Sequence, residues 1–125
     1  MKTLFELKKL IKNKNLDAYI VPKNDEFFGE YAFRNRLKAV SNFSGSAGFA
    51  IITLKLNYLF IDGRYLIQSK MESGKKYKII EIPYTYPKNI LNSNRINKIG
   101  YDPKLFTVST LRRYFGSKFQ LISIK

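Results

Sequence analysis

Residues 44–65 read SGSAGFAIITLKLNYLFIDGRY, and the apolar runs in this stretch decide the fold. Two runs rich in β-branched and aromatic residues, Phe49 to Leu54 and Tyr58 to Ile61, stand on either side of Lys55 to Asn57. Two such runs with a short polar break between them are typical of a β-hairpin. The stretch therefore predicts two antiparallel strands near the middle of the chain.

Signals on both sides of the hairpin delimit its strands. The run from Ser41 to Gly48 is rich in Ser and Gly and predicts a loop. Asp62-Gly63-Arg64 breaks the second strand, and a helix is expected from Tyr65 to Met71, with Gly74 beyond its end. Further along the chain we expect helices over residues 4–12 and 109–115, the latter capped by Ser109, and strands over residues 18–21, 77–82, 99–101 and 119–124.

Helices and strands interleave throughout, which predicts an α/β fold with helices flanking a mixed β-sheet. The chain has 125 residues, the size of one ordinary domain. Hydrophobic residues make up 45% of it and aromatic residues 15%, which is enough to build a packed core. We expect a single domain over residues 1–125, with no repeat or low-complexity linker dividing it.

The chain contains no cysteine and no histidine. The first absence excludes disulfides, zinc–thiolate sites and thiol nucleophiles. The second removes the commonest general base and the commonest transition-metal ligand, so Ser-His-Asp catalysis and His-based metal catalysis are excluded for this chain alone.

The chain is strongly basic, with 23 Lys and Arg against 9 Asp and Glu and a formal net charge of +14. Such an excess is expected of a protein that binds nucleic acid or another polyanion. Lysine, isoleucine and asparagine are all abundant, however, and A/T-rich codons would produce the same bias. Binding of nucleic acid or of an anionic surface is therefore an alternative function that rests on charge.

Neither an export signal nor a membrane span is expected. Charges at Glu6, Lys8 and Lys9 interrupt the apolar N-terminal stretch before it reaches the length of a signal sequence. The longest uncharged run, Ala39 to Leu54, has Asn42 and several Ser and Gly residues within it. A cytoplasmic location and no membrane partner are the expectations.

The loop Ser44-Gly45-Ser46-Ala47-Gly48 is the first candidate site. Small residues let backbone amides approach an anion, as in phosphate-binding loops. The pattern is not a P-loop, because no Gly-Lys-Ser/Thr follows it, and it is not a dinucleotide fingerprint, because it precedes a strand rather than a helix. A tight structural turn is the alternative interpretation, and without a histidine base neither Ser44 nor Ser46 is supported as a nucleophile.

The second candidate is Asp62-Gly63-Arg64-Tyr65, which follows a strand. Arg64 could hold a carboxylate or carbonyl group of a ligand in a forked geometry. A capping Asp62 with Arg64 in a structural ion pair explains the spacing equally well. Asp25, Glu26 and Glu30 also lie close together, but we expect them to cap a helix or face solvent, because hard cations need more oxygen ligands.

Several motifs together resemble one known family. Arg36 to Gly48 is similar to the Ser-Gly-Phe-Ser-Gly-Ser-Ala-Gly loop of Xaa-Pro aminopeptidases, also called aminopeptidase P. Phe49 to Thr53, Asp62-Gly63-Arg64-Tyr65 and Gln68 follow in the family's order and spacing. The flanking parts agree with this resemblance: Leu16 to Pro22 with Asp25, Glu26, Glu30 and Tyr31 before the loop, and Ile99 to Pro103 after it.

The resemblance implies a creatinase/prolidase-type N-terminal domain, which precedes a catalytic "pita-bread" domain in that family. The dinuclear metal centre, typically manganese, belongs to that catalytic domain, so no metal ligand and no cofactor is carried over to this chain. By resemblance, Arg64 points toward the substrate, and Ser44, Gly45, Ser46, Gly48, Asp62, Gly63 and Tyr65 form the surrounding motif or interface. Phe27-Phe28 departs from the family pattern, which often has His-Gln there.

Three hypotheses follow. In the first, the chain is a non-catalytic domain, from a split gene or a truncated enzyme, that packs against a catalytic partner chain or self-associates and meets peptide substrate only in that context. In the second, it is a small basic binding protein, whose lysines at Lys8 to Lys14 and Lys75 to Lys78 should share one face. In the third, it is a degenerate fragment without activity.

Overall fold

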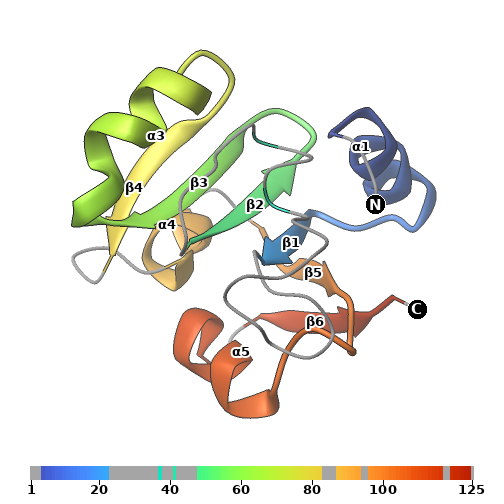
Figure 1. Ribbon diagram of the computed structural model, residues 1–125. Helices are drawn as coiled ribbons and strands as arrows, with labels where there is room; N and C mark the ends of the chain where they lie inside the picture. The colour runs from blue at the N-terminus through green and yellow to red at the C-terminus, as the bar shows by residue number, and fades with distance from the viewer. Residues whose placement is uncertain are drawn as a thin grey trace.

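The computed structural model describes residues 4–22, 37, 41, 48–82, 87–93, 96–116 and 119–124 (Figure 1). Within these residues six strands form one mixed sheet in the order β4-β3-β2-β1-β5-β6. The strands are β1 (Ala18–Pro22), β2 (Phe49–Thr53), β3 (Asn57–Asp62), β4 (Lys78–Ile82), β5 (Lys98–Tyr101) and β6 (Gln120–Ser123). The predicted α/β fold and the central hairpin, β2 with β3, are confirmed.

Five strands of this sheet run in one direction and β2 runs in the other. β2 is antiparallel to β1 and to β3, whereas the pairs β3–β4, β1–β5 and β5–β6 are parallel. We call the end of the sheet at which the five strands finish its carboxyl end, and the opposite end its amino end. Gly48, which precedes β2, therefore lies at the carboxyl end, and the β2–β3 turn lies at the amino end.

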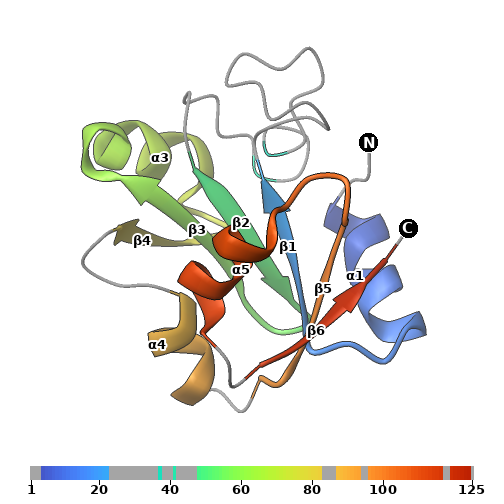
Figure 2. The same cartoon turned by 90° about the horizontal axis from the view of Figure 1, so that it is seen from below.

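Helices cover both faces of the sheet. The helices are α1 (Leu4–Asn13), the 3-10 helix η1 (Gly63–Tyr65), α3 (Leu66–Ser73), α4 (Pro87–Ser93) and α5 (Val108–Phe115). Figure 1 shows α1 and α3 above the sheet and α4 and α5 below it, and Figure 2 shows the lower side facing the viewer.

Strands β1, β2 and β3 carry a packed core on each of their faces. In β1, Tyr19 and Val21 join the cluster that α1 covers, whereas Ala18 and Ile20 join the cluster that α5 covers. A strand with both faces covered reads as a nearly continuous apolar run, and this explains why these strands were recognisable from sequence. Successive side chains alternate between the two clusters in the hairpin strands as well.

The start of α5 differs from the expectation. Thr107 is the N-cap: its backbone is extended and its Oγ1 accepts a hydrogen bond from the Thr110 backbone N–H at 3.2 Å. Ser109, the predicted cap, lies inside the first turn instead. Gly116 follows α5 with φ 67°, the left-handed backbone that favours glycine after a helix.

Two other boundaries also shift. α3 begins at Leu66 after η1 and continues to Ser73, two residues beyond the predicted end. Gly74 caps it as expected, but with φ −63°; a side chain there would collide with the Lys70 carbonyl oxygen. Ser41, predicted as the first residue of a loop, is helical and buried.

Candidate functional site

The carboxyl end of the sheet brings the described part of both candidate motifs together. Phe49 on β2 pairs with Phe60 on β3, so Gly48 comes next to the last residues of β3. Gly48 has φ 139°, a backbone conformation that side chains rarely allow, which explains the glycine. Asp62 ends β3, and η1 then turns the chain into α3. The entrance to β2 and the Asp62-to-Tyr65 motif therefore lie side by side.

Arg64 lies on the surface of this end, in η1. Its guanidinium carbon is 5.3 Å from the centroid of the Tyr65 ring. Tyr65 is half-buried and packs against the core cluster that contains Leu59 and Ile61. An arginine above an aromatic face gains a favourable cation–π contact, so the core-anchored ring holds the guanidinium in place. Its planar set of N–H donors can bind a carboxylate or a carbonyl oxygen.

Gly63 brings the backbone of η1 close to β4. A methyl group at Gly63 would lie 3.2 Å from Oε1 and 3.3 Å from Cδ of Glu81, so a larger residue would force the Glu81 side chain to move. The backbone of Asp62 pairs with Ile82 on β4. The capping or ion-pair role predicted for the Asp62 side chain lies outside what the structure describes.

A buried hydrogen bond ties α3 to the segment before the Ser- and Gly-rich loop. Ser73 Oγ donates to the Ser41 carbonyl oxygen at 2.6 Å, and Ser41 Oγ donates to the Leu37 carbonyl oxygen at 2.7 Å. Both serines are buried, with 5% and 4% of their surface exposed. This contact was not predicted, although two serines four residues apart on a helix, Ser69 and Ser73, were a signal for it.

Some predicted site residues lie outside the described residues. These are Ser44, Gly45 and Ser46 of the loop and the acidic residues Asp25, Glu26 and Glu30. The described part of the chain has no group of three or more His, Cys, Asp or Glu side chains that could hold a metal ion. Over the same part, no helix is both long enough and apolar enough to cross a membrane.

An exposed apolar stripe on α3 lies next to Arg64 in the chain. Ile67 is 77% exposed and Met71 is 82% exposed, and their spacing of four residues puts them on one side of the helix. Their exposure could not be predicted from the sequence, because apolar residues at helical spacing usually face the core. Here Ser69 and Ser73 occupy the buried side.

The chain matches the model of the creatinase/prolidase N-terminal domain over residues 4–124. The chain belongs to this family. It is 35% identical to Xaa-Pro aminopeptidase 1 of Dictyostelium discoideum, with 85% of this chain and 18% of that protein aligned. It is 32% identical to a probable Xaa-Pro aminopeptidase P of Laccaria bicolor, with 98% of this chain and 21% of that protein aligned. The domain thus spans about a fifth of the length of these relatives.

Solved structures share the fold of this creatinase/prolidase N-terminal domain. The X-prolyl aminopeptidase of Caenorhabditis elegans, described as a cytosolic enzyme with a di-nuclear active site, superposes with a TM-score of 0.81 and 25% identity over 97% of this chain and 23% of its own. The N-terminal domain of the cytoplasmic peptidase PepQ from Mycobacterium tuberculosis superposes with a TM-score of 0.75 and 19% identity over 98% of this chain and 92% of that domain. The predicted family resemblance is confirmed.

Proposed function

We propose that this domain packs against the catalytic domain of an Xaa-Pro aminopeptidase and lines one side of its substrate cleft. The observation that carries the proposal is Arg64, an exposed guanidinium held over the Tyr65 ring at the carboxyl end of the sheet. The family relationship supports the partner, since the chain aligns with 18% of an aminopeptidase whose remaining length is outside the match. Arg64 would bind a carbonyl or carboxylate group of the peptide.

The exposed stripe of Ile67 and Met71 supports a docking face on α3. Neighbouring large apolar side chains that are mostly exposed are unfavourable in water and are typical of interaction sites. Both residues are on the helix that directly follows Arg64. A domain that binds this stripe would therefore bring its cleft beside the guanidinium. The proposed occupant is the catalytic domain, whether it is encoded in the same polypeptide or in another.

The chemistry of peptide-bond cleavage is assigned to that catalytic domain. The domain described here would hydrolyse no peptide bond, would contribute no metal ligand and would need no cofactor of its own. A dinuclear metal site, with manganese as the expected metal, would belong to the catalytic partner. A cytoplasmic location is proposed on the same basis, since relatives of this fold include cytosolic and cytoplasmic peptidases.

A chimera tests the proposal. The part of Dictyostelium discoideum Xaa-Pro aminopeptidase 1 that matches this chain is replaced by the chain, and release of the N-terminal residue from an Xaa-Pro peptide is measured with manganese present. The chimera should be active, and Arg64→Ala should lower kcat/KM by about ten- to a hundredfold, because a positioned charged contact to substrate is lost.

Arg113→Ala is the matched control for Arg64→Ala. Arg113 is also exposed and its guanidinium carbon lies 5.5 Å from the centroid of the Tyr114 ring, but it is on α5. The Arg113→Ala variant should leave kcat/KM unchanged. Equal losses in both variants, or activity of the isolated chain with no catalytic domain present, would contradict the proposal.

A further inference from the structure

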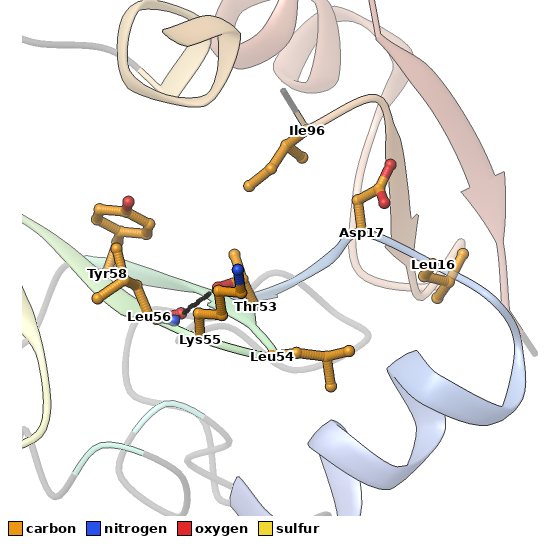
Figure 3. Close-up of a pocket in the computed structure, with 8 residues that line it drawn as sticks. All are labelled: Leu16, Asp17, Thr53, Leu54, Lys55, Leu56, Tyr58 and Ile96. Atoms are coloured by element: carbon orange, nitrogen blue, oxygen red, sulfur yellow. Dashed lines mark hydrogen bonds between the residues drawn. The ribbon is translucent and has the colours of Figure 1, made fainter. Parts of the chain in front are cut away.

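A second site lies at the amino end of the sheet, opposite to Arg64. A hollow of about 380 Å³ is formed there by three segments that are distant in sequence: the residues before β1, the β2–β3 turn and the residue Ile96 before β5. Figure 3 shows Ile96 and Asp17 across the hollow from the residues of the turn. Nothing in the proposed function uses this hollow.

Hydrogen bonds hold the turn that forms one wall. Thr53 Oγ1 donates to the Leu56 carbonyl oxygen at 2.6 Å and accepts from the Leu56 backbone N–H at 2.8 Å (Figure 3). Lys8 Nζ, from α1, donates to the Thr53 carbonyl oxygen at 3.0 Å. The turn is therefore fixed from two sides, and Lys55 at its tip is exposed and lines the hollow.

The opposite wall is fixed through Asp17. Its Oδ2 accepts the backbone N–H of Asn97 at 3.0 Å and that of Lys98 at 2.8 Å. These bonds join the residues before β1 to the start of β5. Asp17 is the one acidic residue among the described residues that line the hollow, and its carboxylate accepts both of these bonds. Both walls are thus formed in the free domain, as in most binding sites for small groups.

The hollow combines an aliphatic lining with a basic surround. Leu54 and Leu56, at the rim, are 52% and 49% exposed, and Leu16 and Ile96 contribute to the lining. Lys14 precedes one wall by two residues, Lys55 lies in the lining, and Lys98 starts β5. None of these three lysine side chains makes a hydrogen bond or ion pair with the described residues.

Further lysines reach the same end of the sheet because α1 and α3 both finish there. Lys12 is in the last turn of α1, and Lys75 and Lys76 follow α3 before β4. The backbone carbonyl of Lys76 accepts a hydrogen bond from Asn57 Nδ2 at 3.2 Å, which places that turn beside the start of β3. Among the described residues, this end of the sheet therefore carries more lysines than acidic side chains.

We propose that the hollow binds an acidic peptide segment of a partner protein that carries an aliphatic side chain. The lysines complement its carboxylates, and the leucines with Ile96 receive the aliphatic group. Single-stranded nucleic acid fits less well, because its bases need exposed rings on which to stack. Tyr58, the one aromatic residue among the described lining residues, is 2% exposed.

The first test measures fluorescence anisotropy of the labelled hexapeptide EELLEE with the full chain. Binding should be detectable, and the peptide EESSEE should bind about tenfold more weakly or less, because burial of the leucines is lost. Amide NMR shifts on adding EELLEE should concentrate at Leu16, Asp17, Ile96 and the turn residues 54–56. Equal binding of the two peptides, or shifts elsewhere, would overturn the proposal.

Charge reversal gives the second test. Lys55→Glu should weaken EELLEE binding about three- to tenfold, since an attractive exposed pair becomes repulsive. Lys104→Glu is the matched control: Lys104 is exposed and its backbone N–H bonds to Asp102 Oδ1 at 3.0 Å in the turn after β5, at the carboxyl end. Equal weakening by both, or tighter binding of oligothymidylate than of EELLEE, would indicate a polyanion surface and reject the peptide site.

Discussion

Tyr77 is a residue whose ionisation should lower the stability of this domain at high pH; burial also raises the pKa of Tyr58. Tyr77 is 5% exposed, and desolvation by burial raises the pKa of its hydroxyl far above the ordinary value. In the unfolded chain the same hydroxyl loses its proton near pH 10, roughly the ordinary tyrosine value. The folded state then holds more protons than the unfolded state, so the free energy of unfolding falls as pH rises above that point.

Urea unfolding between pH 9 and 11, expressed as the slope of stability against pH, measures this effect. We expect Tyr77→Phe to flatten the slope by up to about 1.4 kcal/mol per pH unit, because one titrating group is removed. The slope is the readout because the substitution also removes the hydroxyl's contacts at neutral pH. Tyr114→Phe, at a half-buried tyrosine on α5, is the control, and an unchanged slope in Tyr77→Phe would contradict the assignment.

At the scale of elements, the Ser73–Ser41 hydrogen bond joins α3 to the segment that contains Ser41. Ser73→Ala should lower the free energy of unfolding by about 1–3 kcal/mol, because a buried hydrogen bond between two segments of the chain is lost. Chemical denaturation measures this change.

Ser69→Ala is the matched control for that prediction. Ser69 is also fully buried on α3, but its Oγ donates at 2.9 Å to the Leu66 carbonyl oxygen of the same helix. Removing this local bond should change stability by less than about 1 kcal/mol, since the helix is still held by its backbone bonds. If Ser69→Ala lowers the free energy of unfolding more than Ser73→Ala does, the hydrogen bond between segments does not make the larger contribution to stability.

For the whole molecule, association through α3 is the property to test. Replacing both Ile67 and Met71 by Ser should weaken binding to the separately expressed catalytic part of the relative by about tenfold or more, because apolar contact area is lost. The urea midpoint of the domain should not fall, since both side chains are exposed. Analytical ultracentrifugation of the mixture, and of the domain alone for self-association, measures the change.

Val108→Ser controls for the general effect of removing an exposed apolar side chain. Val108 is 68% exposed on α5, on the other side of the sheet from α3. Its loss should leave association unchanged. If it weakens binding as much as the α3 double variant does, the docking face is not the α3 stripe.

Local sequence determined most elements of this fold. The helical spacing of Leu4, Leu7 and Ile11 predicted α1, and the apolar runs around Lys55 predicted the hairpin, because propensity and periodicity act over a few residues. The short motif beside a strand singled out Arg64 as a candidate, and its role in binding stays a prediction. The helix caps were predicted less accurately. Thr107 and Ser109 are both suitable N-caps, and the extended backbone of Thr107 decides between them.

Tertiary structure decided what these elements place together. The sheet order β4-β3-β2-β1-β5-β6 puts Gly48 beside the end of β3 and brings Asp17, the β2–β3 turn and Ile96 around one hollow. The exposure of Ile67 and Met71 and the Ser73–Ser41 bond also depend on where α3 packs. Such features result from contacts between residues far apart in the chain, whose pairing no local pattern specifies, because burial is a property of the assembled layers.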